Sequence, residues 1–107
     1  MKMLGFRHHL AEQVIAGTKT VTWRLYDDKD LQVGDELSFI DSETKHIFAK
    51  AVIVSLREKK LGDVNDVDYV GHETFADNDE MIKTYREYYG DRVNRETMVK
   101  IIEFKLL

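Results

Sequence analysis

The stretch from Gly17 to Arg24, GTKTVTWR, is the most informative part of the sequence. Threonine alternates in it with large apolar residues, and this period of two is typical of a β-strand. The apolar face is made of Val21, Trp23 and Leu25, and the polar face is made of Thr20, Thr22 and Arg24. We expect the apolar face in the core. The polar face is either the solvated side of an antiparallel strand or one wall of a site, and the alternation is compatible with both.

A helix is expected immediately before this strand. Between residues 7 and 16 the apolar residues recur with helical spacing and form one stripe, made of Leu10, Ala11, Val14 and Ile15. Gly17 stands where a helix C-terminus often takes a left-handed residue. Lys19 follows that bend, so its long side chain can turn back over the polar face of the strand.

Downstream of Arg24 the sequence predicts further strands and a second helix. In chain order we expect a polar loop (26–30), a turn (33–35), a strand (36–40), a hairpin turn (41–45), a strand (46–54), a helix capped by Asp77, Asn78 or Asp79 and ended by Gly90, and a strand (98–107). Residues 63–75 are compatible with a short helix or an irregular loop. The apolar phases of the strands place in the core Val21, Trp23, Phe39, Val52, Val54, Ile102 and Phe104.

The order of these elements favours a small β-barrel. The connections are mostly too short for the crossovers that parallel strands need. We therefore expect one domain, 1–107, of the α+β or mainly β class, a mixed or mainly antiparallel barrel with helices packed on it. A small open α+β sheet is the alternative.

Composition limits the functions that are open to the chain. Its 107 residues carry a formal net charge of −4, which disfavours a protein that coats long nucleic acids, although a local basic patch could still bind RNA. Cysteine is absent, so disulfides and thiolate metal sites are excluded. No apolar run is long enough to span a membrane, and the N-terminal segment is too short in apolar residues for a secretory signal. We expect a cytoplasmic protein with no membrane partner.

The histidines have no spacing typical of a metal site. They are His8, His9, His46 and His72. Neighbouring residues of a helix point about 100° apart, so His8 and His9 do not form a natural pair of ligands. We expect no metal, and nothing in the sequence indicates a cofactor.

Two further groups could extend a binding surface. The tyrosines of the second predicted helix, Tyr85, Tyr88 and Tyr89, could stack on a base, but their helical spacing favours the core. The basic cluster of Arg57, Lys59 and Lys60 is typical of a solvated strand end, and it could also widen a patch beside a cleft.

Three segments together resemble the ASCH domain family, a branch of the PUA-like barrels. They are AGTKTVTWR (16–24), VGDELSF (33–39) and VKIIEFKLL (99–107). Gly17, Lys19 and Arg24 match the family signature G-x-K-x-x-x-x-R. The resemblance spans nearly the whole chain, and it implies a small β-barrel with a cleft that associates with RNA or nucleosides.

A small bacterial subgroup of this family hydrolyses N(4)-acetylcytidine to cytidine and acetate. The resemblance to this subgroup implies that the catalytic residues would be Lys19, Thr22 and Glu73. Lys19 and Thr22 match the subgroup directly, whereas Glu73, in GHETF, is placed by a one-residue gap. The chain departs from the subgroup at Trp23, which replaces a smaller residue, and in the loop 26–30.

Three residues of this stretch would contact the ligand, namely Gly17, Thr20 and Arg24. The planar fork of Arg24 suits a phosphate, a ribose or a base edge. Two mechanisms of amide hydrolysis stay open. In one, Lys19 with a lowered pKa activates the threonine hydroxyl as nucleophile. In the other, Glu73 activates water or moves the proton while Lys19 stabilises the oxyanion.

Three hypotheses about function follow from these observations. The first is a binding module that takes RNA or a small nucleoside into its cleft. The second is an amidohydrolase of acylated cytidine. The third is a domain with neither activity that serves contacts with other proteins. The polar cleft is common to the first two, which differ in the role of Thr22. The oligomeric state does not follow from the sequence.

Overall fold

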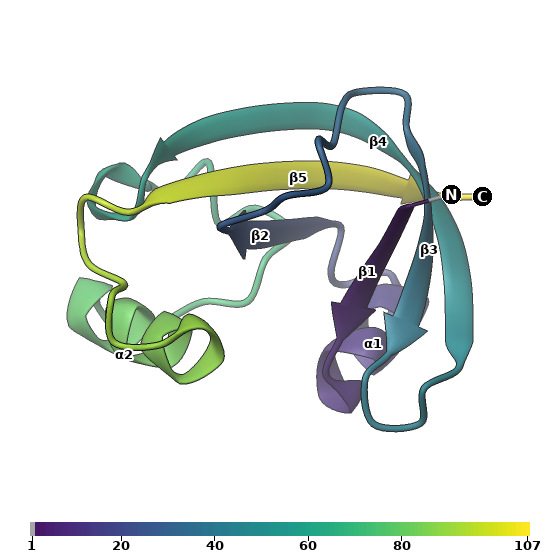
Figure 1. Ribbon diagram of the computed structural model, residues 1–107, viewed down its shortest axis with the longest axis horizontal. Coiled ribbons are helices and arrows are strands. Elements are labelled where there is room, and N and C mark those ends of the chain that lie inside the picture. Colours follow the sequence, from purple (N-terminus) through teal and green to yellow (C-terminus); the bar gives the residue numbers. More distant parts are fainter. Residues whose placement is uncertain (1) are drawn as a thin grey trace.

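Figure 1 shows the computed structural model, which describes residues 2–107. In this part of the chain, five strands form one curled sheet, a half-barrel, and two α-helices and a short 3-10 helix accompany it. The elements in chain order are β1 (Lys2–Phe6), α1 (His8–Ala16), β2 (Val21–Leu25), β3 (Glu36–Asp41), β4 (Ile47–Lys60), η1 (Leu61–Asp63), α2 (Asn78–Tyr89) and β5 (Met98–Leu106). No helix within 2–107 is long and apolar enough to cross a membrane.

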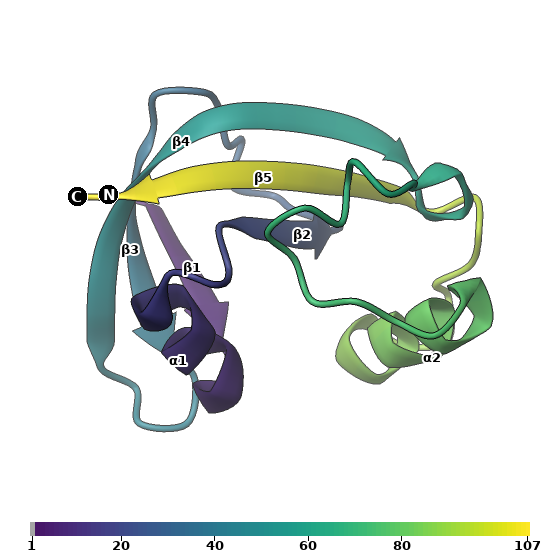
Figure 2. The ribbon, with the colours of Figure 1, turned by 180° about the vertical axis from the view of Figure 1, so that it is seen from behind.

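The sheet is mixed, with strand order β1-β3-β4-β5-β2. β1 pairs with β3 in parallel, and the other neighbouring strands are antiparallel. The long strands β4 and β5 form the arch in Figures 1 and 2, with α1 beneath one end and α2 beneath the other. β1 and β2 are the edge strands, so backbone pairing does not close the barrel. The predicted α+β class is therefore confirmed, with the barrel open on one side.

Two clusters of buried side chains lie on opposite faces of β5. Ile102 belongs to the cluster that packs with α1, and its neighbour Ile101 belongs to the cluster that packs with α2. Successive residues of a strand point to opposite faces, so one strand supports both clusters. The core is thus divided in two, whereas we expected the inside of a single barrel. The expected core residues that are buried are Val21, Trp23, Phe39, Ile102 and Phe104.

The prediction for β4 was wrong in phase. Val54 is 44% exposed and Val52 is only partly buried, whereas Ala51 and Ile53 are buried. Both phases of this segment are apolar, so alternation could not choose between them. The strand also continues to Lys60, beyond the predicted end, after an irregularity in its pairing with β5.

No pattern in the sequence indicated β1. Only Leu4 and Phe6 of this strand are buried, so its apolar pattern is too short to stand out. The helix ends, in contrast, lie at the expected residues. Gly17 ends α1 with φ of 84°, and the Asp77 side chain caps α2 by accepting a hydrogen bond from the Glu80 N–H. Beyond η1, the segment 64–76 has neither helix nor strand, so the loop alternative is correct there.

Candidate functional site

A cavity of about 510 Å³ lies at the β2 edge of the sheet. Its walls come from β1, α1, β2, the loop before α2, and α2 itself. The lining residues discussed below are Lys19, Thr22, Trp23, Arg24, His72 and Glu73. Thr22 and Trp23 belong to opposite faces of β2, and both reach the cavity because β2 is an edge strand. The volume is within the range of about 300–1,000 Å³ that is usual for small-ligand sites.

A buried ion pair lies in this cavity. The Lys19 side chain is 2% exposed, and its Nζ donates to Glu73 Oε1 at 2.7 Å and to the carbonyl O of Val21 at 2.8 Å. Burial lowers the pKa of Lys19, and the nearby Glu73 carboxylate acts against that effect. Burial would raise the pKa of Glu73, but the hydrogen bonds and charges of His72 and Lys19 outweigh it and lower the value to about 2.

Glu73 reaches Lys19 because the loop before α2 docks on the start of β2. The carbonyl O of Gly71 accepts hydrogen bonds from Thr20 N at 2.9 Å and from Val21 N at 3.1 Å. Gly71 has φ of 79°, and a Cβ atom at this position would lie 2.1 Å from Thr20 Oγ1. Glycine alone satisfies both conditions. The docked backbone then carries Glu73 over Lys19 across 54 positions of sequence.

Arg24 links the two edge strands of the half-barrel. Its Nη2 donates to the carbonyl O of Gly5 in β1 at 2.8 Å, and its guanidinium lies 4.7 Å from the centroid of the Phe6 ring. Its Nε donates to Thr22 Oγ1 at 3.2 Å, so the threonine hydroxyl lies beside a positive charge. Burial lowers the pKa of Arg24. This residue therefore both shapes the cavity wall and brings charge to it.

His72 is a member of the site that the sequence analysis did not identify. Its ring stacks on Trp23, with centroids 4.2 Å apart and planes 17° apart. Its Nδ1 lies 2.8 Å from the carbonyl O of Glu73, and its Nε2 lies 2.7 Å from Glu73 Oε1. Burial lowers the pKa of His72, and the hydrogen bond with Glu73 acts in the opposite direction. The adjacency of histidine and glutamate in GHETF was the signal available in the sequence.

The structure brings four of the six predicted site residues into one cavity, namely Lys19, Thr22, Arg24 and Glu73. Gly17 and Thr20 are not among the residues that line it. Gly17 ends α1, and Thr20 packs against the docked Gly71. Their contact with a ligand stays a prediction, as do the catalytic roles of the other residues.

The tyrosines of α2 and the basic cluster have different surroundings. Tyr85, Tyr88 and Tyr89 all line the cavity, although Tyr85 is also a core residue of the cluster that packs with α2. In the basic cluster, Arg57 Nη2 and Lys59 Nζ each lie 2.8 Å from the buried Asp68 carboxylate. Lys60 Nζ lies 2.8 Å from Glu96 Oε2. Two carboxylates thus compensate part of the charge of these three cations within the chain. The tyrosines, and not the basic cluster, extend the site.

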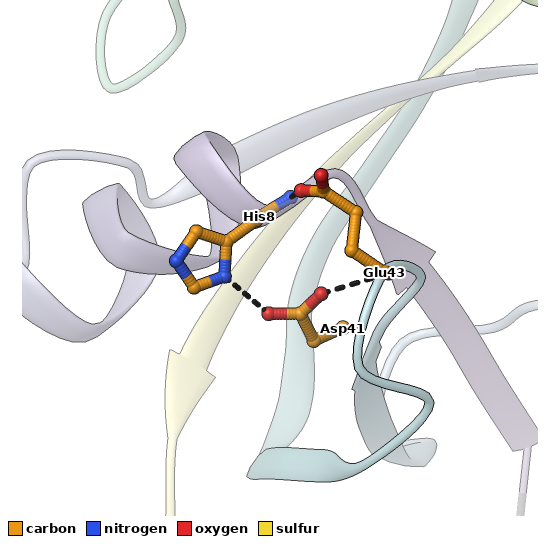
Figure 3. Close-up of side chains that lie close together, drawn as sticks. All are labelled: His8, Asp41 and Glu43. Carbon is orange, nitrogen blue, oxygen red and sulfur yellow. Dashed lines mark hydrogen bonds and ion pairs between the residues drawn. The ribbon is translucent and has the colours of Figure 1, made fainter.

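A second group of polar side chains lies where the β3–β4 turn meets α1 (Figure 3). Ligand-type atoms of His8, Asp41 and Glu43 all lie within 4.8 Å of one another, as in a metal site. They already contact each other, however: His8 Nδ1 lies 2.6 Å from Asp41 Oδ2, and the His8 N–H donates to Glu43 Oε2 at 2.8 Å. The preceding residue, Arg7, provides no side-chain cap for α1. The turn therefore supplies the missing cap.

No protein-family model matches the chain, and no curated protein matches its sequence. Solved structures share its fold. The ASCH domain from Lactobacillus crispatus is 13% identical with a TM-score of 0.72, covering 98% of this chain and 79% of that one. The ASCH protein from Zymomonas mobilis is 12% identical with a TM-score of 0.67, covering 96% and 65%. The hypothetical protein PH0355 is 22% identical with a TM-score of 0.76, covering 100% of both chains. The expected fold is therefore confirmed: the chain has the fold of the solved ASCH domain structures.

Proposed function

We propose that the cavity binds a nucleoside unit, either free or within a short RNA. The observation that carries this proposal is the convergence of Lys19, Arg24 and Glu73 with tyrosine rings in one cavity. Charged donors and a carboxylate can read the polar edge of a base, and aromatic rings can stack on its face. The solved ASCH structures share the fold that forms this cavity.

The charge distribution favours a small or locally presented ligand. Lys19 and Arg24 contribute two positive charges to the cavity, and Glu73 contributes one negative charge. The chain as a whole carries a formal charge of −4, so it offers little attraction to a long polyanion. A base with its ribose and an adjoining phosphate is the ligand class that best matches these charges.

Trp23 provides a direct test of binding. It is the only tryptophan in the sequence, it lines the cavity and it stacks on His72. Titration with cytidine, a cytidine nucleotide and a short RNA should change its fluorescence, whereas ribose should not. Arg24→Ala should weaken binding, and Lys83→Ala, which removes an exposed charge on α2, should leave it unchanged. Failure of every nucleoside and RNA to bind would end this proposal.

Hydrolysis of N(4)-acetylcytidine is a second candidate. It is favoured by the Thr22 hydroxyl, which shares the cavity with the Lys19–Glu73 pair and accepts a hydrogen bond from Arg24. The threonine oxygen would bond to the acetyl carbon, the bond to the cytosine amino nitrogen would break, and the threonine proton would pass to that nitrogen. Water would then release acetate and restore the hydroxyl. The lowered pKa of Lys19 supports its role as base, although Glu73 remains the alternative.

The release of cytidine from N(4)-acetylcytidine tests this second candidate. Thr22→Val keeps the shape of the side chain and removes the hydroxyl, so turnover should collapse while cytidine affinity changes little. Unimpaired turnover in Thr22→Val would move the nucleophile to a water molecule held by Glu73. If the wild type releases no cytidine from several acylated cytidines, the cavity is a binding site only.

A further inference from the structure

Both ring nitrogens of His72 face oxygen acceptors of Glu73. Nδ1 lies 2.8 Å from the carbonyl O, and Nε2 lies 2.7 Å from Oε1. A neutral imidazole has one N–H and one bare nitrogen, whereas a carbonyl and an ionised carboxylate can only accept. A neutral ring beside an ionised carboxylate would therefore leave one of these contacts without a proton. The geometry requires one additional proton in the pair, on His72 or on Glu73.

We propose that His72 and Glu73 form one acid–base pair that holds a single additional proton between Nε2 and Oε1. His72 is then a positioning residue, which fixes the Glu73 carboxylate in the cavity. Three contacts hold its ring: the Nδ1 bond to the main chain, the stacking on Trp23 and the edge of Tyr69. The His72 side chain is 1% exposed, so water cannot easily replace these contacts.

The groups around the pair determine how readily it releases this proton. Lys19 Nζ donates to the same Oε1 at 2.7 Å, and its positive charge favours release. From α2, the Tyr85 hydroxyl lies 3.4 Å from Nε2. Burial of the ring also favours release. Once the proton has left, one ring nitrogen is bare and faces an oxygen, the carboxylate oxygen at Nε2 or the carbonyl oxygen at Nδ1, and the repulsion shifts the ring relative to Glu73. The two close contacts together are therefore those of the protonated pair.

NMR of the free protein tests the proton itself, with ¹⁵N-labelled histidine rings and ¹³C-labelled glutamate carboxyls. We expect His72 and Glu73 to report one common midpoint, and Glu73→Gln to abolish it by removing the partner carboxylate. The exposed His46 is the control, and its ring signals should be the same in Glu73→Gln and in the wild type. A His72 ring with one bare nitrogen at every pH at which the protein is folded, beside a carboxyl that titrates independently, would overturn the proposal.

The role of the pair in the site rests on the proposed function, and calorimetric titration with cytidine at several pH values tests it. The affinity should fall as the pH rises through the common midpoint, by up to about tenfold per pH unit because one proton is linked to binding. His72→Gln, whose amide can donate to Oε1 but does not titrate, should show no such transition. An identical pH profile in His72→Gln would refute the positioning role. If the wild type binds no nucleoside and no RNA, the proposed function fails, and NMR alone still decides whether the pair shares a proton.

Discussion

Trp23 serves both the core and the cavity. It is 2% exposed, belongs to the buried cluster that packs with α2, and lines the cavity. Its loss leaves a large void, so Trp23→Ala should lower the free energy of unfolding by about 3–5 kcal/mol in urea denaturation followed by circular dichroism. Trp23→Phe is the control. It should cost much less, because it keeps most apolar contacts and removes an Nε1–H that has no hydrogen-bond partner among the described residues. An equal loss in both variants would contradict a packing role.

Glu73 should make stability depend on pH in the acid range. The pKa of this carboxyl falls from 4.5 to about 2 on folding, and its side chain is 25% exposed. A lowered folded-state pKa contributes stability that is present above 4.5 and is lost as the pH falls toward 2. The shift corresponds to at most about 3 kcal/mol.

Chemical denaturation at several pH values measures this contribution. Glu73→Gln should be less stable than the wild type near neutral pH, and the difference should shrink as the pH falls. Glu103→Gln, which changes an exposed carboxylate on β5, should keep the wild-type pH dependence. The assignment to Glu73 would not survive if Glu73→Gln lost stability with acid as steeply as the wild type.

At the level of elements, the docking of the loop before α2 depends on Gly71. Gly71→Ala would impose a strained backbone and a contact with Thr20 Oγ1, so the loop should shift. We expect a loss of about 1–3 kcal/mol in the free energy of unfolding, together with weaker cytidine binding. Gly34→Ala is a matched control, because Gly34 has φ of 93° and a Cβ atom at that position would meet nothing within 4 Å. It should show the backbone cost without the change in binding.

The contact between α1 and the β3–β4 turn should respond to pH near neutrality (Figure 3). The hydrogen bond and charge of Asp41 raise the pKa of His8 above 6.5. A raised folded-state pKa gives stability that is fully present below 6.5 and is lost as the pH rises through the higher folded value.

Asp41→Asn should remove this part of the pH dependence, as measured by denaturation at pH values on both sides of 6.5. His46→Gln, a change at an exposed histidine outside the contact, should retain it. If Asp41→Asn and the wild type lost the same stability with rising pH, the His8–Asp41 pair would not be the cause.

Patterns of neighbouring residues in the sequence predicted some elements correctly and gave no indication of others. Gly17 and the alternation of β2 depend on neighbouring residues alone, so the sequence placed both correctly. Val52 and Val54 were misplaced because their segment is apolar in both phases. The approach of Glu73 to the signature lysine depends on the docking of Gly71, which is a contact between distant segments. The resemblance to a family suggested this approach, whereas periodicity could not.

For the whole molecule, the half-barrel closes through a side chain. Arg24 donates to Gly5 and lies over Phe6, so it holds β1 near β2 where the backbones do not pair. Arg24→Ala should therefore raise hydrogen exchange in β1, and leave exchange in the centre of β4 unchanged, because β4 is paired on both sides. Lys60→Ala, which breaks an ion pair with Glu96 at the far end of β4, should not affect β1. Unchanged β1 exchange in Arg24→Ala would contradict the closure.

The position of β2 in the sheet has a consequence for biosynthesis. β2, which carries Thr22 and Arg24, comes early in the chain, yet its backbone pairs with β5, the last of the five described strands in chain order. While the ribosome is still making residues 26–97, β2 has no strand to receive its hydrogen bonds. A nascent chain can form the β3–β4 hairpin during this time. The cavity can form only after β5 has left the exit tunnel and paired with β2. In ribosome-bound chains that end before Met98, β2 should therefore be accessible to proteases and chaperones.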